Sequence, residues 1–408
     1  MFTTENECME YLKDNEVKFI LLAFCDTFGS MKNVSIMPRD VHRAFTTGIS
    51  LDASAIGGFG SVDESDLILK PVPSTLALLP WRPAQGRVAR FYCHIIYPDG
   101  TPFEMDSREI LRRSVEKAGK LGIRVSFGAE CEFYLFKLDE NGEPTRIPAD
   151  HAHYMDAAPF DKGEIVRREI CLALEKMNFT PETSHHEEGP GQNEIDFRYS
   201  GAMSSADNVL TFRSVVETVA AANGLHADFS PKPMENEAGN GFHINMSPRR
   251  KNSDEPAPEL KRWFMAGILA HVREITAFLN STEDSYRRLG TFKAPRFVTW
   301  SPRNRSQLIR IPAGTGEFDR IELRSPDCMT NPYIAYALLL EAGMEGIMKQ
   351  LEPPAPENRN LYEVPEADLT SLEQLPATLE EALSLAEKSE LIRRVLPEAM
   401  LAALRERR

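Results

Sequence analysis

Two glutamates, Glu130 and Glu132, lie two positions apart in the apolar, aromatic-rich stretch GAECEFYLF (128–136). The apolar residues of this stretch alternate, as in a half-buried β-strand. Both carboxylates then point to the opposite face, roughly 6.5–7 Å apart along the strand. At an effective dielectric of about 20, their charges would repel by roughly 2–3 kcal/mol. A solvated strand face could bear that repulsion, and the alternative is that cations lie between the two groups.

The same alternation recurs in QNEIDFRYS (192–200), GFHINMS (241–247) and DRIELRS (319–325). In each stretch the apolar residues share one parity. The polar residues of the other parity are Glu194, Asp196 and Arg198, then His243, Asn245 and Ser247, then Arg320, Glu322 and Arg324. A barrel or a curved sheet with one face toward a cavity would bring these side chains together, whereas an ordinary solvated sheet face would carry the same pattern.

The segment HHEEGPGQNE (185–194) adds a glycine-interrupted loop that carries His185, His186 and Glu187. Several carboxylates with one imidazole suit a hard divalent ion such as Mg²⁺ or Mn²⁺. The sequence has no CxxC or HExxH motif to indicate zinc. It also lacks a Walker A motif and a Rossmann GxGxxG, so any nucleotide must be bound in another way.

Arginines gather in two later segments, SYRRLG (285–290) and FVTWSPRNRSQLIRIP (297–312). These residues are Arg287, Arg288, Arg303, Arg305 and Arg310. Any one of them suits a surface ion pair, but beside a carboxylate cluster they suggest recognition of a substrate carboxylate and a transferring phosphate.

The whole chain has 408 residues, 42% of them hydrophobic and 26% charged, which is typical of a globular protein of two or three domains. Its net charge of −14 disfavours nucleic-acid and anionic-membrane partners. The six cysteines form no CxxC pair and indicate reduced thiols in a cytoplasmic protein. The acidic start of the chain lacks the basic and apolar regions of a signal peptide, and the apolar segment 334–348 is too short to span a membrane.

Strand-like runs at 18–25 and 87–97 predict a small, mainly β domain at residues 1–104. The segment 106–122 changes to a helical period, with Asp106 and Glu109 resembling a capping box, and it opens a second domain at 105–408. Long amphipathic helices at 259–280 and after NPY (331–333) mix with strands there. Because strands and helices do not alternate regularly, the pattern predicts an α+β fold.

These stretches together resemble a type I glutamine synthetase over almost the full length of the chain. The matching motifs are LDASAIGGF (51–59), GAECEFYLF, SHHEEGPGQNEIDF (184–197), AGNGFHINMS (238–247), SYRRL (285–289), RNRSQLIRIP (303–312) and RIELRSPD with NPY (320–333). The resemblance implies an amino-terminal β-grasp domain and a catalytic domain with a curved antiparallel sheet flanked by helices. It also implies a homo-oligomer, a dodecamer of two stacked hexameric rings, in which neighbouring subunits share each active site.

The resemblance also implies two metal sites with Mg²⁺ or Mn²⁺. Glu132, Glu187 and Glu194 match one, and Glu130, His243 and Glu322 match the other. In the implied reaction, ATP phosphorylates the side-chain carboxylate of glutamate, and an amine then displaces phosphate from the acyl phosphate.

Further positions match substrate-binding and catalytic residues of the family. Arg288 matches the residue that holds the substrate α-carboxylate, Arg324 one near the reacting carboxylate, and His185 one that lines the reaction centre. Gly239 belongs to the glycine-bearing loop before the metal-binding histidine. The positions near phosphates and nucleotide are Arg305, Arg310, Arg320, Glu182, Tyr199 and Ser247.

The amine half of the site departs from the family. The usual loop RLVPGYEAP, whose glutamate closes the site and helps deprotonate ammonium, is RLGTFKAP (288–295) here, with Lys293 in place of that glutamate. In the ammonium pocket Asp52 and Tyr154 are kept, but Ala55 replaces a serine. A cation at position 293 would repel ammonium.

The sequence therefore predicts an ATP-dependent glutamate–amine ligase of the glutamine synthetase type. Two alternatives are a γ-glutamyl ligase that uses an amine other than ammonia and a noncatalytic assembly or regulatory homologue. Tyr362 in NLYEVP resembles a tyrosine that some type I enzymes adenylylate, but we expect an ordinary exposed loop tyrosine.

Overall fold

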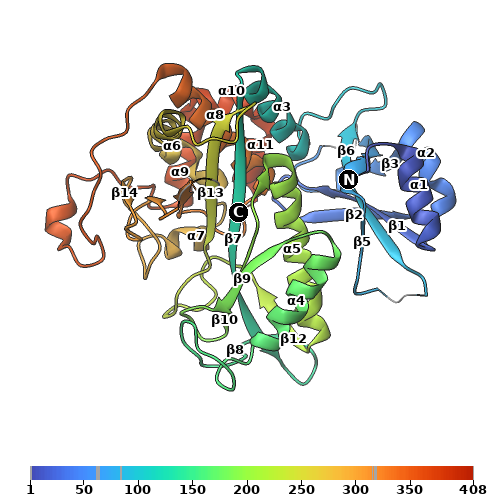
Figure 1. Cartoon of the computed structure of the whole chain (residues 1–408), viewed down its shortest axis with the longest axis horizontal. Helices are drawn as coiled ribbons and strands as arrows, with labels where there is room; N and C mark the ends of the chain where they lie inside the picture. Colours follow the sequence, from blue (N-terminus) through green and yellow to red (C-terminus); the bar gives the residue numbers. More distant parts are fainter. Residues whose placement is uncertain (1, 61–64, 83–84, 315, 317–318, 408) are drawn as a thin grey trace.

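The computed structural model describes residues 2–60, 65–82, 85–314, 316 and 319–407. Within these residues the chain forms a smaller amino-terminal part and a larger carboxy-terminal part, each built on its own sheet (Figure 1). The smaller part, blue in Figure 1, lies beside the long helices of the larger one.

The amino-terminal part has six strands among the described residues, in the order β2-β1-β6-β4-β3, with β5 paired to β6. The central pair β1 and β6 is parallel, and most apolar residues of both strands are buried. Its elements are α1 (Glu5–Asp14), β1 (Phe19–Cys25), β2 (Met31–Ile36), α2 (Val41–Thr46), β3 (Ile49–Asp52), β4 (Asp66–Pro71), β5 (Ala77–Leu78) and β6 (Val88–Ile96).

The larger part holds ten strands of the described chain, in the order β14-β15-β16-β13-β7-β10-β9, with β8, β11 and β12 also paired to β7. All of its pairs are antiparallel except the short edge pair β14–β15, which is parallel. Its strands are β7 (Ile123–Leu138), β8 (Pro144–Pro148), β9 (Pro181–His186), β10 (Gln192–Phe197), β11 (Ser200–Gly201), β12 (Leu225–Asp228), β13 (Phe242–Arg250), β14 (Trp300–Pro302), β15 (Ile309–Ile311) and β16 (Ile321–Leu323).

Helices pack against this sheet and bury its apolar face (Figure 1). α5, α6 and α8 are apolar over much of their length, and α6 and α8 approach so closely that a Cβ on Gly267 would lie 2.2 Å from the Ala342 carbonyl oxygen. The helices are α3 (Ser107–Lys120), α4 (Glu164–Lys176), α5 (Ala202–Ala222), α6 (Pro258–Leu279), α7 (Glu283–Arg288), α8 (Pro332–Lys349), α9 (Leu379–Lys388), α10 (Glu390–Val395) and α11 (Glu398–Glu406).

The predicted capping box at the start of α3 is wrong. Asp106 does cap the helix, since its carboxylate accepts hydrogen bonds from the backbone N–H of Arg108 and of Ile95. Glu109, however, turns to Arg112 and Arg113, which lie three and four positions further along the helix. Charge-assisted bonds to two guanidinium groups are stronger than a bond to a backbone amide, so the side chain leaves the cap.

The two parts contact each other through buried polar groups on β6 and α5. Within the larger part, Asp207 of α5 forms a two-pronged ion pair with Arg108 of α3, with Nε–Oδ1 and Nη2–Oδ2 distances of 3.0 Å. The Tyr92 hydroxyl donates a hydrogen bond to the Asp207 carbonyl oxygen at 3.0 Å. The chain passes from one part to the other between Ile96, the end of β6, and Ser107, the start of α3; the boundary at 104/105 remains a prediction.

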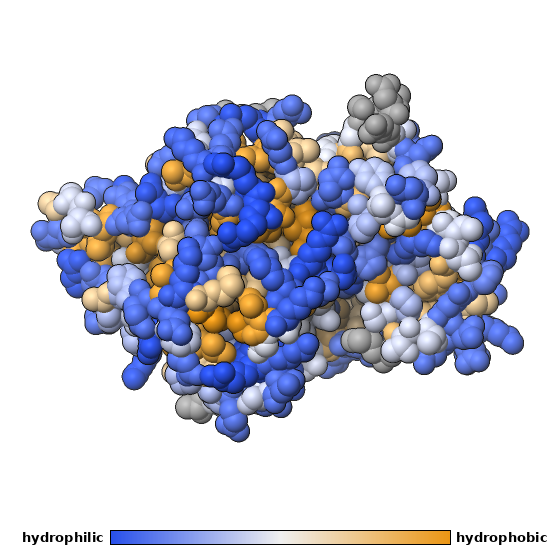
Figure 2. Space-filling view, turned by 90° about the horizontal axis from the view of Figure 1, so that it is seen from above, coloured by the Kyte–Doolittle hydropathy of each residue, from blue (hydrophilic) through white to orange (hydrophobic). Residues whose placement is uncertain are grey.

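Hydrophilic residues dominate the face shown in Figure 2, and hydrophobic side chains are interspersed there in smaller groups. Among the helices that the structure describes, none combines the length and the apolar character required to cross a membrane. All six cysteines are free thiols.

Candidate active site

The register of the large sheet sets the polar residues of the sequence motifs side by side. Strand β7 lies between β10 and β13, so its two glutamates face residues of both neighbours. The pairs directly opposite each other are Glu132 with Glu194, Glu194 with His185, Glu130 with His243, and Glu322 with Arg310. Side chains at such paired positions are close enough to interact.

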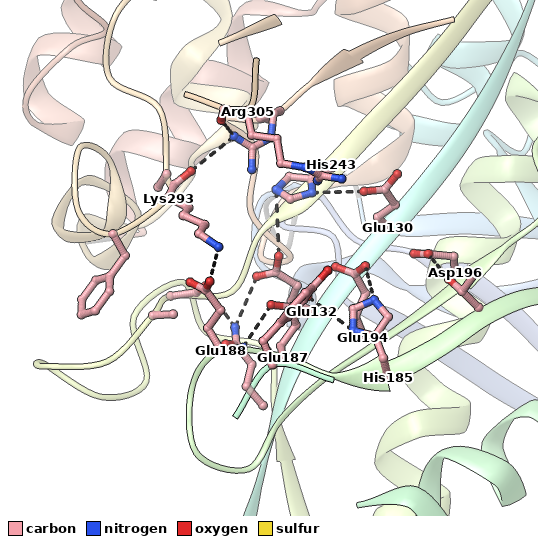
Figure 3. A pocket seen from close by; sticks show the side chains of 18 of the residues that line it. Glu130, Glu132, His185, Glu187, Glu188, Glu194, Asp196, His243, Lys293 and Arg305 are labelled. Atoms are coloured by element: carbon pink, nitrogen blue, oxygen red, sulfur yellow. Dashed lines mark hydrogen bonds and ion pairs between the residues drawn. The ribbon is translucent and has the colours of Figure 1, made fainter. Parts of the chain in front are cut away.

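Except for Glu322, these groups face a cavity of about 630 Å³ and not bulk solvent (Figure 3). Glu130, Glu132, Glu187, Glu194 and His243 all line it. The interpretation of GAECEFYLF as a solvated strand face is therefore wrong. The sheet curls over these side chains, while the alternate residues of β7 are buried in the core.

Glu322 is fully buried beside the cavity and contacts groups that line it. Its Oε1 lies 3.7 Å from His243 Nδ1 and 3.3 Å from Arg324 Nε, and its Oε2 pairs with Arg310 Nε. Oε1 nevertheless accepts no hydrogen bond. A buried carboxylate oxygen that accepts no hydrogen bond is costly unless a ligand completes it.

Among the residues that the structure describes, two clusters could hold a cation, and the potential ligand atoms of each lie within 4.8 Å of one another. One joins Glu130, Glu194 and His243, and the other joins His185, Glu187 and Glu194. The predicted sets differ, because here Glu194 belongs to both clusters. Glu132 instead accepts a hydrogen bond from the Gly241 amide at 2.6 Å.

Crowding of carboxylates changes their protonation. Burial and the neighbouring Glu132 raise the pKa of Glu187 to about 8. Burial, then Asp196 and Glu132, raise the pKa of Glu194 well above its ordinary value. Burial and nearby carboxylates also raise the pKa of Asp196, to about 7. Without a cation, part of the cluster therefore stays protonated at neutral pH, and a divalent cation could take the place of those protons.

Glu130 differs from these residues. Burial alone would raise its pKa, but hydrogen bonds with His243 Nδ1 and from Asn245 Nδ2 stabilise the carboxylate and lower the pKa overall. Carboxylate oxygens together with one or two imidazole nitrogens are a donor set that suits a hard divalent cation. The residues present fit Mg²⁺ or Mn²⁺.

A second cavity of about 270 Å³ adjoins the first and shares Glu130, Thr183, Asp196 and Arg320 with it. All four predicted nucleotide-binding residues line this second cavity: Glu182, Tyr199, Ser247 and Arg320. Apolar side chains such as Met246 and Phe197 line it too. An apolar recess beside a charged cavity suits a flat base whose phosphates reach toward the carboxylate cluster.

The predicted carboxylate-binding arginine, Arg288, is buried and lines the first cavity. Its Nη1 donates a hydrogen bond to the Ser325 carbonyl oxygen at 2.8 Å. Gly239 packs against it so closely that a Cβ there would lie 2.9 Å from Arg288 Cγ and 2.3 Å from the Pro231 carbonyl oxygen. This close approach explains why position 239 is a glycine.

Arg305, Arg310 and Arg324 also line the first cavity. Arg324 Nη1 donates to the Arg305 carbonyl oxygen, and Arg310 pairs with Glu322 as described above. Three guanidinium groups therefore lie on the wall next to the carboxylate cluster, where they can neutralise a phosphate or a substrate carboxylate.

Two protein-family models match the chain: "Glutamine synthetase, catalytic domain" at residues 104–407 and "Glutamine synthetase, beta-Grasp domain" at residues 16–98. The chain belongs to the glutamine synthetase family. The glutamine synthetase of Clostridium saccharobutylicum is 42% identical over 404 residues, which cover 96% of this chain and 91% of that protein. The enzyme of Thermotoga maritima is 42% identical over 392 residues, or 93% and 89% of the two chains.

A solved GmaS/ADP complex is similar with a TM-score of 0.88 and 27% identity, covering 98% of this chain and 94% of that one. The family, the fold with its β-grasp domain, and the class of carbon–nitrogen ligase predicted from the sequence are thereby confirmed. Members of this family generally use ATP and divalent metals, and the acidic and histidine groups of the cavity are candidate ligands.

Lys293, the main departure from the family motifs, points toward the cavity. Its ammonium group forms an ion pair with Glu188 (Figure 3). It also lies 5.7 Å from the centre of the Tyr154 ring. Sequence reasoning did not assign Glu188 a role, because its neighbour Glu187 accounted for the motif. The second of the two adjacent glutamates in HHEEGPGQNE was the feature of the sequence that could have identified Glu188 as a site residue.

Tyr362 is exposed, as expected, but it is not an isolated loop residue. Its hydroxyl donates a hydrogen bond to the Lys293 carbonyl oxygen at 2.7 Å and lies 3.0 Å from that of Arg305. It therefore connects the loop of Lys293 with the arginine segment of the cavity wall.

Asp52 and Ala55 line neither of the two cavities described above. The Asp52 carboxylate is exposed in the amino-terminal part and accepts hydrogen bonds from the amide and the hydroxyl of Ser54, which lower its pKa. Within one chain, Asp52 is thus not brought to the other predicted site residues.

Proposed function

We propose that this protein is an ATP-dependent glutamate–amine ligase that acts through a γ-glutamyl phosphate intermediate. The observation that carries the proposal is the junction of the two cavities. A carboxylate and imidazole cluster with an arginine wall lies directly beside a smaller, partly apolar recess of about 270 Å³. A similar solved structure is a GmaS/ADP complex, which supports an adenine nucleotide as a ligand of this fold.

Two or more Mg²⁺ or Mn²⁺ ions, held by Glu130, Glu132, Glu187, Glu194, His243 and Glu322, would neutralise phosphate charge and align the transfer. Arg288 binds the α-carboxylate of the substrate. Arg324 and Arg305 stabilise charge on the reacting group and the transferring phosphoryl group, as guanidinium groups do in such sites. His185 lines the reaction centre.

Two acceptors are candidates. One is ammonia, the substrate of glutamine synthetases, and the other is a larger amine. Lys293 and Ala55 favour the second candidate, because the cation replaces the loop carboxylate that would hold ammonium and take its proton. The intact cluster of potential ligands disfavours a noncatalytic role, since unpaired buried carboxylates are costly to maintain.

The position of Asp52 supports an oligomer in which one subunit completes the site of the next. We propose a cytoplasmic dodecamer with shared sites. Asp52 and Ala55 would then approach the cavity of a neighbouring subunit, where Asp52 would contact the amine.

The test is ATP- and glutamate-dependent phosphate release across a panel of amines, with the product identified by mass spectrometry. We expect a γ-glutamyl amide and a strict requirement for divalent cation. Glu130→Gln should abolish both signals while the protein stays folded. Phosphate release that does not depend on an amine, or that yields no amide with any amine, would refute the proposal.

A further inference from the structure

A primary ammonium group already lies at the mouth of the cavity, on the side chain of Lys293. It contacts the Glu188 carboxylate on one side (Figure 3). On the other side it lies over the ring of Tyr154, 5.7 Å from the ring centre. A carboxylate combined with an aromatic face is a recognised environment for an organic ammonium ion. All three residues line the cavity that also holds the carboxylate cluster.

This ion pair is accessible and displaceable. The side chains of Lys293 and Glu188 are 56% and 31% exposed. Pairs of this exposure contribute little to stability, so a ligand can compete with them. The Glu188 backbone is better fixed, because its N–H donates a hydrogen bond to Glu187 Oε2 at 3.1 Å.

Exposed side chains with apolar parts line the same cavity. Tyr154, Met155 and Phe292 are 46%, 60% and 51% exposed, and the centre of the Phe292 ring also lies 4.5 Å from the Lys232 ammonium group. Exposed apolar groups gathered at a cavity mouth gain by covering an apolar part of a ligand. The free ammonium ion has no such part, whereas an alkylamine does.

We propose that Glu188, with the ring of Tyr154, forms the subsite for the ammonium group of a primary alkylamine, and that Lys293 fills this subsite in the free protein. The proposal rests on the glutamate–amine ligase function proposed above and names its acceptor. The aliphatic stem and charged end of Lys293 imitate the acceptor. The amine displaces this side chain, and its alkyl group packs against Met155 and Phe292.

The test compares KM values for n-butylamine, ammonium and glycine in the wild type, Glu188→Gln and Lys293→Met. Glu188→Gln should raise the KM for butylamine about tenfold or more, since a charge-assisted bond is lost. The KM values for ATP and glutamate should stay unchanged. Lys293→Met should lower the KM for butylamine about two- to fivefold. This factor corresponds to the energy of one exposed ion pair, which in the wild type competes with the amine for Glu188. Glu140→Gln, in the turn between β7 and β8, is the matched control.

Hydroxylamine separates this inference from the proposed function. It is largely uncharged at neutral pH and traps an acyl phosphate as a hydroxamate, so it should not need the Glu188 subsite. We expect equal hydroxamate formation by the wild type and Glu188→Gln. No hydroxamate from the wild type would refute the proposed function and the subsite together. Normal hydroxamate with an unchanged KM for butylamine in Glu188→Gln would refute the subsite alone.

The results with ammonium and glycine show which class of amine the Glu188 subsite binds. A wild-type preference for ammonium over butylamine would overturn the alkylamine assignment. A preference for glycine that Lys293→Met abolishes would also overturn it, because the ion pair would then bind a zwitterion. Calorimetric titration with n-butylammonium, without ATP or glutamate, should detect binding to Lys293→Met and none to the double variant with Glu188→Gln.

Discussion

Removing divalent cations should make the stability of this protein depend strongly on pH. In the cluster that contains Glu187 and Glu194, potential ligand atoms lie within 4.8 Å of each other. Two unit charges at that distance repel by about 3–4 kcal/mol at an effective dielectric of about 20. The pKa of Glu187, raised from an ordinary 4.5 to about 8, corresponds to about 4–5 kcal/mol by linkage. Both approaches give a destabilisation of about 3–5 kcal/mol when this cluster is ionised without a cation.

The direction in which stability changes with pH follows from proton binding. Because the pKa of Glu187 is higher in the folded than in the unfolded state, the folded protein binds more protons between pH 4.5 and about 8. Its stability is therefore greatest below pH 4.5 with respect to this group and falls as the pH rises to about 8. A bound divalent cation replaces the proton and removes this loss.

Thermal unfolding with EDTA or with saturating Mg²⁺, from pH 5 to 8.5, measures the effect. With EDTA we expect Tm to fall by about 5 °C over this range, and the gain from Mg²⁺ to grow as the pH rises. Glu194→Gln should flatten the EDTA curve, while the surface variant Glu140→Gln should follow the wild type. A Tm with EDTA that is constant or rises toward pH 8, or a gain from Mg²⁺ that is equal at pH 6 and pH 8, would refute the reasoning.

Three more outcomes can be measured. Mixed oligomers reassembled from Asp52→Ala and Glu322→Ala subunits should recover part of the activity that each variant lacks, and strictly unrescued activity in verified mixed oligomers would contradict a shared site. Tyr362→Phe removes the hydroxyl between two loop carbonyls and should lower kcat/KM by about three- to tenfold at an unchanged Tm, the value of one neutral hydrogen bond; wild-type kinetics would show that the contact is idle. Asp207→Ala leaves Arg108 buried without its partner and should cost about 3–5 kcal/mol in urea unfolding, so a loss below about 1 kcal/mol would disprove the importance of this pair.

The sequence by itself determined the fold class and the types of group in the site. Period-2 alternation is a local property of a strand, so it was possible to assign Glu130 and Glu132 to one face of β7 from GAECEFYLF alone. The same reasoning found the polar faces of β10, β13 and β16, and the ordered motifs identified the family. Local pattern was less reliable at the start of α3. There the Glu109 side chain could bond either to the backbone amide of Asp106 or to nearby arginines, and it pairs with Arg112 and Arg113.

Only the tertiary structure decided which groups meet. The strand register placed His185 opposite Glu194 and Glu194 opposite Glu132, and it turned these faces toward a cavity instead of solvent. The pairing of Lys293 with Glu188 joins loops 105 positions apart in the sequence. Loops have no periodicity from which a contact can be deduced, and their ends are positioned by the sheet and helices that carry them. The partner of Lys293 therefore became visible only when the whole chain was folded.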